Sequence, residues 1–206
     1  MDTLSQFLKT RWAHILSGVL LGLIYMLFAY AHLVSFFKSG NAALLIFAIS
    51  EAFIVAIYIF RSKAVTISII AYDWFVAIVG TFSPLFLRPA EFGVLPMANS
   101  LIILGAVMQI LSVLSLNYSF ALVAAQRVIK TDGMYRFIRH PLYASYYLSL
   151  LGYVLTNSTL ENGLVYIACI FFLYLRIISE EKHLSLDPFY RDYKLKVRYK
   201  LIPYLL

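Results

Sequence analysis

Cysteine and charged residues are scarce in this 206-residue chain. It has one cysteine, and Asp, Glu, Lys and Arg together make up 13% of its residues. A single cysteine, Cys169, within an apolar run excludes a disulfide framework and a cysteine-rich metal site. No His lies in a recognised metal-binding motif, so we expect no metal. The G-x-G-x-x-G and P-loop patterns are also missing, which excludes a soluble nucleotide-binding domain of the Rossmann type.

Hydrophobic residues are abundant instead, at 62% of the chain, which is far above the share in soluble domains. Most of them lie in runs close to the roughly 20 residues that an α-helix needs to cross a bilayer. We therefore predict an all-α, polytopic integral membrane helical bundle with about six spans. The predicted spans are Ala13–Phe36, Ala42–Phe60, Val65–Leu87, Pro96–Leu122, Leu142–Thr156 and Leu160–Ser179.

The basic residues predict how this bundle is oriented. With a cytoplasmic N-terminus, six spans place only Lys38 and Arg88 of the 17 Lys and Arg residues on the outer face. Cytoplasmic loops of membrane proteins carry such an excess of basic residues. We predict that both termini are cytoplasmic. The net charge of +7 then needs no nucleic acid to explain it, and membrane lipids are the expected partner of the basic face.

Two carboxylates, Glu51 and Asp73, fall inside predicted spans, where an ionisable group is costly and often functional. One interpretation is a proton or cation pathway in a small transporter. The other is that one or both are protonated or paired with a neighbouring Tyr or Ser. Neither carboxylate has a basic partner within the spans, so the case for a transporter is weak.

A polar segment, which we call block 1, interrupts the apolar runs at Lys130–Tyr143. Asp132 and Gly133 predict a tight turn, and Pro141 is suited to the first position of a helix because its missing N–H costs nothing there. The start of that helix, with Arg139, His140 and Tyr143 around it, favours an anionic or polar ligand. A loop that only anchored the protein by positive charge would need the arginines but not the other residues.

A second polar segment, block 2, covers Arg176–Leu184 and follows one apolar hairpin later. Arg176 and Glu180 are four residues apart and therefore share a helical face. Glu180 and Glu181 at the C-terminal end of a span oppose the helix dipole. We therefore predict that a cationic group pairs with them, from block 1 or from a ligand.

Three motifs run through the blocks and the tail: V-x-K-T-D-G-M-Y-R-x-x-R-H-P-L-Y from Val128, R-x-x-x-E-E-x-x-L from Arg176, and Y-x-x-Y-x-x-x-V-R-Y-K-L-I-P from Tyr190. In combination they resemble the isoprenylcysteine carboxyl methyltransferase family, a membrane family related to the phospholipid N-methyltransferases. The resemblance covers about the last 80 residues, and the first 120 match only as generic spans. Ala144 and Ser145 depart from the family, which often has a small residue and then Gly there.

The resemblance implies a methyltransferase that binds S-adenosylmethionine between its C-terminal helices and their cytoplasmic ends. The catalytic residues it implies are Arg176, which faces the methyl acceptor, and Glu180, which also contacts the cofactor. We add Glu181 to the catalytic residues as a candidate proton acceptor. The other cofactor-binding residues that the resemblance implies are Arg127, Val128, Ile129, Lys130, Tyr135, His140, Pro141, Leu142 and Tyr143. We accordingly divide the chain into N-terminal transmembrane helices (1–122), for packing and acceptor access, and a C-terminal catalytic region (123–206).

The methyl acceptor is left open between several lipophilic molecules from the bilayer. A prenylcysteine-like carboxylate leads, because it is already ionised at neutral pH and Arg176 could bind it through two hydrogen bonds. A phospholipid amine would need a proton acceptor, for which Glu181 and His183 are candidates, and a small thiol is a further possibility. Outside the methyltransferases, the alternatives are a membrane reductase of the sterol-reductase type that uses NADPH, and the transporter.

Overall fold

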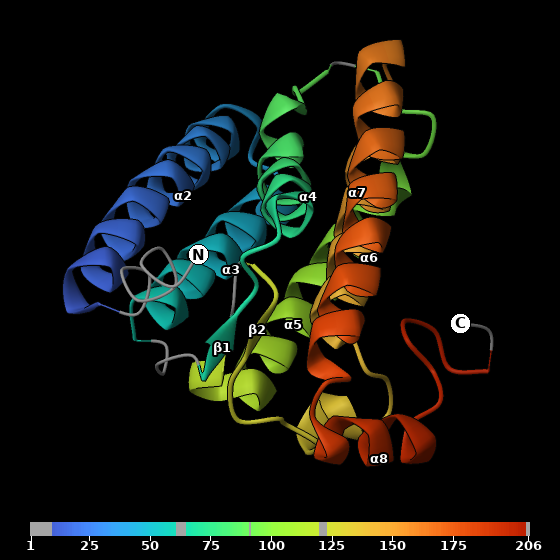
Figure 1. The fold of residues 1–206 in the computed structure, drawn as a ribbon. Coiled ribbons are helices and arrows are strands. Elements are labelled where there is room, and N and C mark those ends of the chain that lie inside the picture. The colour runs from blue at the N-terminus through green and yellow to red at the C-terminus, as the bar shows by residue number, and fades with distance from the viewer. Residues whose placement is uncertain (1–9, 61–64, 91, 120–122, 205–206) are drawn as a thin grey trace.

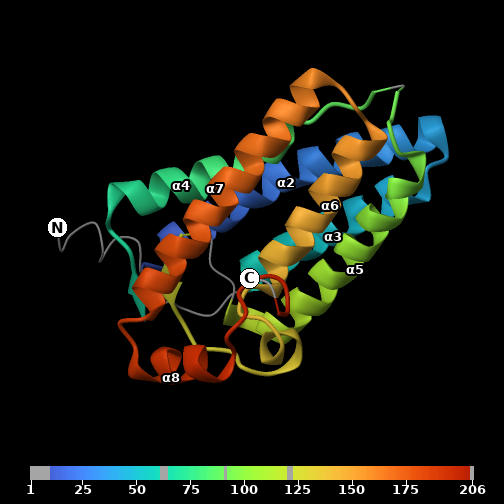
Figure 2. The same ribbon diagram turned by 90° about the vertical axis from the view of Figure 1, so that its right-hand side faces the viewer.

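The protein is a bundle of helices, and the computed structural model describes residues 10–60, 65–90, 92–119 and 123–204 (Figures 1 and 2). The helices are α2 (Arg11–Ser39), α3 (Ala42–Phe60), α4 (Ala71–Phe82), α5 (Asn99–Leu116), α6 (Pro141–Thr156), α7 (Leu160–Leu184) and α8 (Pro188–Lys196). Short 3-10 turns are η1 (Ser83–Phe86), η2 (Pro96–Ala98), η3 (Asn117–Ser119) and η4 (Gly133–Arg136). The predicted all-α membrane bundle is confirmed, apart from one short pair of strands.

Three helices in the described part of the chain are long and apolar enough to cross a membrane. They are Ile15–Ser39 of α2, Pro96–Leu116 of η2 and α5, and Leu160–Leu184 of α7. The helix α3 has the predicted bounds, and α6 starts one residue before its prediction. The predicted number of six spans stays a prediction.

The third predicted span is wrong at its start. Instead of one helix from Val65 to Leu87, the chain begins with β1 (Thr66–Ile67), which pairs antiparallel with β2 (Ala125–Gln126). Three consecutive β-branched residues, Val65 to Ile67, favour an extended backbone over a helix. The helix α4 follows and gives way to η1 around Pro84, which has no N–H to continue the helical hydrogen bonds.

The ends of two other predicted spans also differ from the structure. The helix α5 ends at Leu116 rather than Leu122, because Asn117 takes a positive φ of 54° that stops the helix. Residues 120–122 lie outside the described part of the chain. The helix α7 continues past Ser179 to Leu184, so block 2 is entirely helical.

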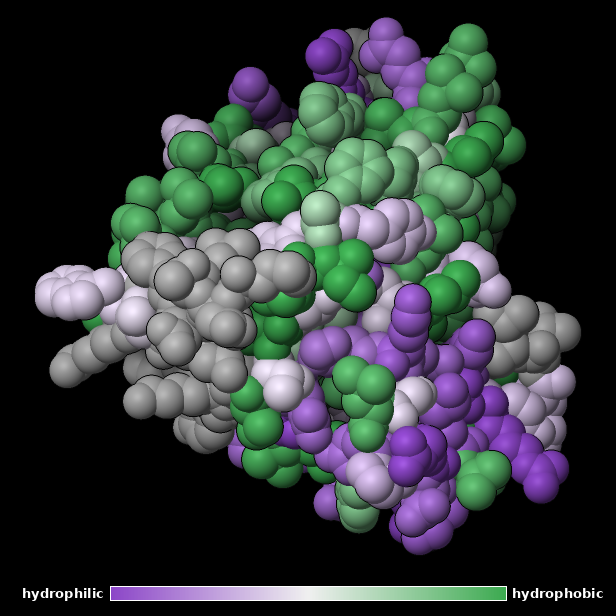
Figure 3. Space-filling view, in the orientation of Figure 1, coloured by the Kyte–Doolittle hydropathy of each residue, from purple (hydrophilic) through white to green (hydrophobic). Residues whose placement is uncertain are grey.

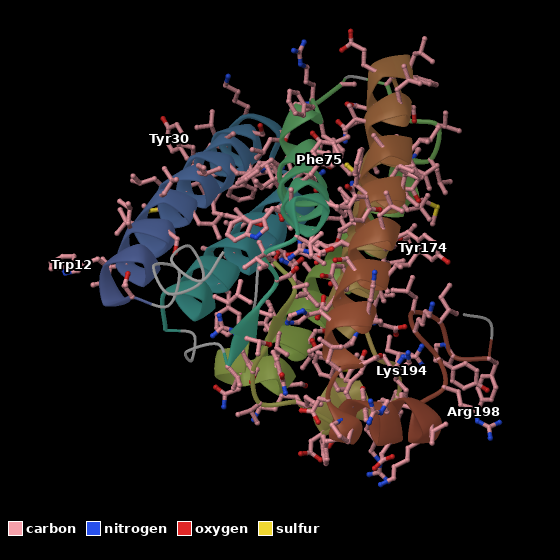
Figure 4. All side chains as sticks on the ribbon, viewed as in Figure 1. Trp12, Tyr30, Phe75, Tyr174, Lys194 and Arg198 are labelled. Atoms are coloured by element: carbon pink, nitrogen blue, oxygen red, sulfur yellow. The ribbon has the colours of Figure 1, made fainter. Side chains whose placement is uncertain are left out.

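Apolar side chains cover much of the outer surface of the bundle. Figure 3 shows a broad hydrophobic region over the helices and hydrophilic residues gathered at the end of the molecule that α8 crosses. Lys194 and Arg198 lie at this polar end, whereas Tyr174 lies higher on α7 and points outward (Figure 4). Soluble monomeric proteins rarely expose a contiguous apolar surface of this extent. The surface therefore suits a lipid environment with α8 at one face of the membrane.

The opposite end of the bundle holds the turns between α2 and α3 and between α6 and α7. There, Asn41 Nδ2 donates a 3.2 Å hydrogen bond to Asn99 Oδ1. Lys38 and Pro89 line the same hollow at this end, and Arg88 adjoins it. The two basic residues predicted for the outer face thus share one end, away from α8. The orientation of the termini stays a prediction.

Small residues allow α5 and α6 to pack closely, and this sets the position of block 1. A Cβ atom at Gly105 would lie 2.1 Å from Ser149 Oγ, and one at Gly152 would lie 2.8 Å from the backbone nitrogen of Ile102. Small side chains at helix interfaces let membrane helices approach in this way. The start of α6 is therefore held firmly against α5.

Asp73 fastens α4 to α7. Its carboxylate is buried and accepts hydrogen bonds from the hydroxyls of Ser68 and Ser179, the second over 2.5 Å. Asp73 is thus paired with serine side chains. This agrees with the second interpretation from the sequence, pairing with a neighbouring polar residue, rather than with a proton or cation pathway. The side chain of Glu51, the other carboxylate of that prediction, lies outside the described residues.

Candidate active site

Block 1 turns sharply before it reaches α6. Gly133 has a φ of 59°, which favours glycine, and a Cβ atom there would lie 2.4 Å from Ser115 Oγ. The same Ser115 oxygen accepts a 3.1 Å hydrogen bond from the Met134 N–H. The turn is therefore anchored on the end of α5. Pro141 is the first residue of α6, as predicted.

The C-terminal tail runs beside the last residues of block 1. The backbone N–H groups of Arg139 and His140 donate 2.9 Å hydrogen bonds to the carbonyl oxygens of Tyr199 and Lys200. Arg139 also donates through its guanidinium to two further tail carbonyls, those of Val197 (2.8 Å) and Arg198 (2.6 Å). Block 1 and the tail therefore form one structural unit at the α8 end of the bundle.

Glu181 joins block 2 to this unit. Its Oε1 accepts from Arg139 Nε at 2.7 Å and from His140 Nε2 at 3.1 Å. The ammonium groups of Lys194 and Lys200 lie 3.8 and 3.9 Å from Oε2. The prediction that a cationic group pairs with the glutamates, from block 1 or from a ligand, is confirmed for Glu181, whose partner Arg139 belongs to block 1.

Glu180, the neighbouring glutamate, has a different partner. The Tyr143 hydroxyl donates a 2.7 Å hydrogen bond to Glu180 Oε2. The guanidinium carbon of Arg176 lies 5.4 Å from the centroid of the Tyr143 ring, within the range of a cation–π contact. Arg176 also donates a 2.9 Å hydrogen bond to Thr81 Oγ1. Tyr143 therefore links the two residues of block 2 that were predicted to share a face.

These side chains border a cavity, which we call the polar cavity, with an empty volume of about 890 Å³ that includes space open to solvent. Its lining residues are Tyr25, Thr81, Leu116, Ser119, Ala125, Arg127, Val128, Ile129, Lys130, Tyr135, Arg139, His140, Leu142, Tyr143, Tyr146, Arg176, Glu180, Leu184, Tyr190 and Tyr193.

A second cavity adjoins the first, and we call it the apolar cavity. Its empty volume of about 590 Å³ also includes space open to solvent. Most of its lining comes from hydrophobic side chains of α2, α4, η1, α6 and α7, among them Ile24, Phe28, Leu85, Leu150 and Leu173. The two cavities share Tyr25, Thr81, Tyr146 and Arg176 in their walls. The Arg176 guanidinium therefore lies where a polar site meets an apolar one.

The structure brings most of the predicted site residues to the polar cavity. The exceptions are Pro141 and Glu181, which are not among its lining residues. Pro141 is buried at the start of α6, where it serves the helix. Glu181 is buried in contact with Arg139 and His140, which suits a residue that positions others rather than one that meets a substrate. The individual roles of all these residues stay predictions.

Several lining residues were missed from the sequence. Tyr25 on α2 and Thr81 on α4 lie within apolar runs, where no local pattern marks them. Tyr190 and Tyr193 on α8 belong to the third motif, so a signal existed there. Thr81 and Tyr25 also show that helices from the predicted N-terminal region complete the cavity.

Tyrosine hydroxyls at the α8 end of the cavity are held in the protonated form. Burial raises the pKa of Tyr135 well above its usual value, and Glu180 raises it further. Burial is also the main cause that raises the pKa of Tyr190 and of Tyr193. At neutral pH these hydroxyls are therefore hydrogen-bond donors, and that of Tyr193 donates to the Tyr135 carbonyl oxygen at 2.6 Å.

The polar cavity offers a carboxylate, basic side chains and apolar surface together. Glu180 can hold a cation, Arg127 and Lys130 can attract an anion, and Val128 and Ile129 can cover a flat apolar ring. A zwitterionic ligand that also carries a ring system would use all three. S-adenosylmethionine, the cofactor implied by the sequence motifs, has this composition and fits the donor set.

The sequence was compared with curated proteins and with models of protein families. A search of curated proteins finds no match to the chain. A family model described as phospholipid methyltransferase matches residues 94–187, which include both blocks. That family belongs to the isoprenylcysteine carboxyl methyltransferase superfamily. Over this segment the chain is similar to the phospholipid methyltransferases.

Proposed function

We propose that the protein is an integral membrane methyltransferase that uses S-adenosylmethionine to methylate a lipophilic acceptor, with a prenylcysteine-like carboxylate as the leading candidate. The meeting of the polar and apolar cavities at Arg176 is the observation that carries this proposal. A methyltransferase for lipids needs a polar cofactor and an apolar acceptor side by side. Two adjoining cavities of opposite character meet this need.

The residues of block 1 and block 2 suit the cofactor side of the reaction. When bound, S-adenosylmethionine supplies a methyl group carried on a cationic sulfur. Glu180 would hold the ammonium group of its amino-acid end, and the hydrogen bond from Tyr143 fixes the carboxylate for this task. Arg127 and Lys130 would attract the carboxylate of the same end. The chain's contribution would be chiefly to position the two reactants against each other.

The surroundings of Arg176 suit an anionic acceptor. Its guanidinium can donate two parallel hydrogen bonds to a carboxylate, and the apolar cavity beside it can take up a hydrocarbon chain. A carboxylate acceptor requires no proton removal. The two nearby glutamates are already engaged, Glu180 by Tyr143 and Glu181 by Arg139. These contacts support an acceptor that arrives ionised.

A phospholipid amine is the second candidate, and the description of the matching family favours it. This reaction would need a proton acceptor. Glu181 and His183, the two candidates from the sequence, are not among the residues that line the polar cavity, and His183 Nε2 lies 3.0 Å from Thr66 Oγ1. The present geometry therefore favours the carboxylate.

The test is transfer of a radiolabelled methyl group from S-adenosylmethionine by the purified full-length protein. The acceptors are a prenylcysteine analogue, a phosphatidylethanolamine vesicle and a total lipid extract. We expect label in the prenylcysteine analogue that mild base releases as methanol, because a methyl ester is base-labile. Base-stable label in the phospholipid would favour the second candidate.

Variants of residues where the polar and apolar cavities meet make this test more specific. Arg176→Ala and Glu180→Ala should each abolish transfer, whereas Arg88→Ala, at the opposite end of the bundle, should leave it unchanged. Failure of the wild-type protein to bind S-adenosylhomocysteine or to label any acceptor would contradict the proposed function. Preferential binding of NADPH would move the assignment to a reductase.

A further inference from the structure

Tyr190, near the start of α8, brings a buried hydroxyl to the polar cavity. The residue is 3% exposed and lines the cavity. Its Oη has no hydrogen-bond partner within the described residues. Leaving a buried polar group unpaired costs free energy, so an unpaired group in a native structure requires an explanation. A ligand in the cavity is the simplest one here.

Tyr193, one turn later on the same helix, provides an internal comparison. It is 4% exposed, lines the same cavity, and its ring lies 5.7 Å from that of Tyr190. Its hydroxyl, however, donates to the Tyr135 carbonyl oxygen at 2.6 Å. Two tyrosines with nearly equal burial on one helix therefore differ in how their hydroxyls are used within the described residues. The hydroxyl of Tyr193 is used by the fold and that of Tyr190 is not.

The position of Tyr190 is set by a well-anchored helix end. Asp187 caps α8 by accepting a 2.8 Å hydrogen bond from the Phe189 N–H. Its other carboxylate oxygen accepts from Gln126 Nε2 at 2.6 Å, which ties the cap to β2. The backbone on the N-terminal side of Tyr190 is therefore held in place, as a binding residue on a rigid element requires.

The charged neighbours of Tyr190 indicate which part of a ligand it would meet. After burial, the charges of Glu181 and Glu180 raise the pKa of Tyr190, and that of Arg139 lowers it. The hydroxyl is thus a protonated donor within electrostatic range of Glu180. Glu180 is also the residue proposed to hold the ammonium group of the cofactor.

We infer that Tyr190 is a further cofactor-binding residue, whose hydroxyl donates a hydrogen bond to the carboxylate of the amino-acid end of S-adenosylmethionine. The inference rests on the proposed function and adds a residue that lies outside the segment matched by the family, 94–187. It also assigns a use to α8, since this helix then contributes directly to the cofactor site.

The test compares Tyr190→Phe with Tyr193→Phe in the purified full-length protein. Calorimetry measures the affinity for S-adenosylhomocysteine and for 5′-methylthioadenosine, which lacks the amino-acid end. For Tyr190→Phe we expect about tenfold weaker binding of S-adenosylhomocysteine, the effect of one lost hydrogen bond to a charged group. Binding of 5′-methylthioadenosine should not change.

Thermal unfolding without ligand separates a binding role from a structural one. Tyr190→Phe should melt at the same temperature as wild type or higher, because it removes an unpaired buried hydroxyl. Tyr193→Phe should melt lower, because the Tyr135 carbonyl loses its partner. The rise in melting temperature that S-adenosylhomocysteine produces should be smaller in Tyr190→Phe than in wild type.

Three results would overturn the inference. The first is equal affinity of Tyr190→Phe and wild type for S-adenosylhomocysteine. The second is an equal loss of affinity for S-adenosylhomocysteine and 5′-methylthioadenosine, which would mean that the hydroxyl contacts another part of the ligand. The third is a melting temperature of ligand-free Tyr190→Phe as low as that of Tyr193→Phe, which would mean that the hydroxyl has a structural partner. Wild-type protein that does not bind S-adenosylhomocysteine would instead refute the proposed function, and the inference with it.

Discussion

Arg139 Nε donates a 2.7 Å hydrogen bond to Glu181 Oε1, and this buried contact joins the segment before α6 to the last turns of α7. The two residues are 42 positions apart in the chain. Arg139 lines the polar cavity, and Glu181 is next to Glu180, which also lines it. Arg139 also holds the tail through two carbonyl groups. The pair therefore keeps the walls of the cavity together.

Loss of Glu181 should destabilise the protein strongly. Glu181→Leu leaves the Arg139 guanidinium buried without its carboxylate, and removal of one partner of a buried pair costs about 3–5 kcal/mol. In the double variant Arg139→Leu/Glu181→Leu, the loss should be smaller than the sum of the single losses by about 1–3 kcal/mol. Unfolding in detergent measures all three variants. Additive losses would show that the contact contributes nothing of its own.

A matched control for this pair lies at the other end of the bundle. Glu161 faces Arg88 at 4.0 Å, and both side chains are more than three-quarters exposed. Exposed pairs of this kind contribute little to stability. Glu161→Leu should therefore leave the unfolding temperature nearly unchanged.

Thr81 should act as a positioning residue for Arg176. Thr81→Val removes the oxygen that accepts the 2.9 Å hydrogen bond from the Arg176 guanidinium. We expect methyl transfer to fall about tenfold, which corresponds to one lost hydrogen bond. The affinity for S-adenosylhomocysteine should not change.

Thr81→Ser keeps the hydroxyl and should retain most of the activity. Assays of kcat and of KM for the acceptor, together with cofactor affinity, distinguish this role from a general loss of structure. An equal loss in Thr81→Ser and Thr81→Val, or weaker cofactor binding in both, would contradict it.

Gly105 should tolerate no side chain. A Cβ atom there would lie 2.8 Å from the Ser149 backbone nitrogen and 2.9 Å from the Ser145 carbonyl oxygen, so Gly105→Ala must push α5 and α6 apart. Overpacking of this kind costs about 1–3 kcal/mol. Gly18→Ala is the control, because no atom outside its own helix lies within 4 Å of a Cβ at that position. Alanine there should be neutral or stabilise by up to about 1 kcal/mol, as thermal unfolding can determine.

Stability should fall at high pH through the buried tyrosines of the α8 end. The pKa values of Tyr135, Tyr190 and Tyr193 are raised in the folded protein, chiefly by burial. Their contribution to stability is therefore complete below the unfolded pKa of about 10 and is lost as the pH rises above it. Thermal unfolding between about pH 8 and pH 11 measures this loss.

A tyrosine-to-phenylalanine variant tests the assignment of this pH dependence. In Tyr193→Phe the free energy of unfolding should fall less steeply above pH 10 than in wild type. The difference in slope should be about 1.4 kcal/mol per pH unit, the value for one titrating group. An identical slope in the two proteins would mean that other groups cause the alkaline loss.

Much of the helical framework could be predicted from hydropathy alone. The run Ala42–Phe60 is helix α3 with the predicted bounds, and Pro141 begins α6 as its chemistry requires. The start of the third span could not be predicted in this way. Thr66 and Ile67 pair with β2, whose partner residues lie about 60 positions away, and hydropathy does not record such long-range pairing.

The site was predictable where its residues stand out from their surroundings. Polar residues in block 1 and block 2 are costly among apolar runs, so their presence indicated a function, and most of the residues named from them line the polar cavity. Thr81 and Tyr25 could not be found, since each is unremarkable in its own helix. Glu181 was expected beside the reaction, but its geometry suits the contact with Arg139 and His140.

The sequence by itself determined that this chain is a helical membrane protein with two polar segments near one end, because composition and the spacing of charges decide which residues can enter lipid. Tertiary structure alone decided which residues meet. Close packing of α5 on α6, the contact of Arg139 with Glu181, and the approach of α4 to α7 bring Thr81 to Arg176 and Tyr190 to the polar cavity. Such contacts depend on the relative positions of helices, which no local pattern of residues specifies.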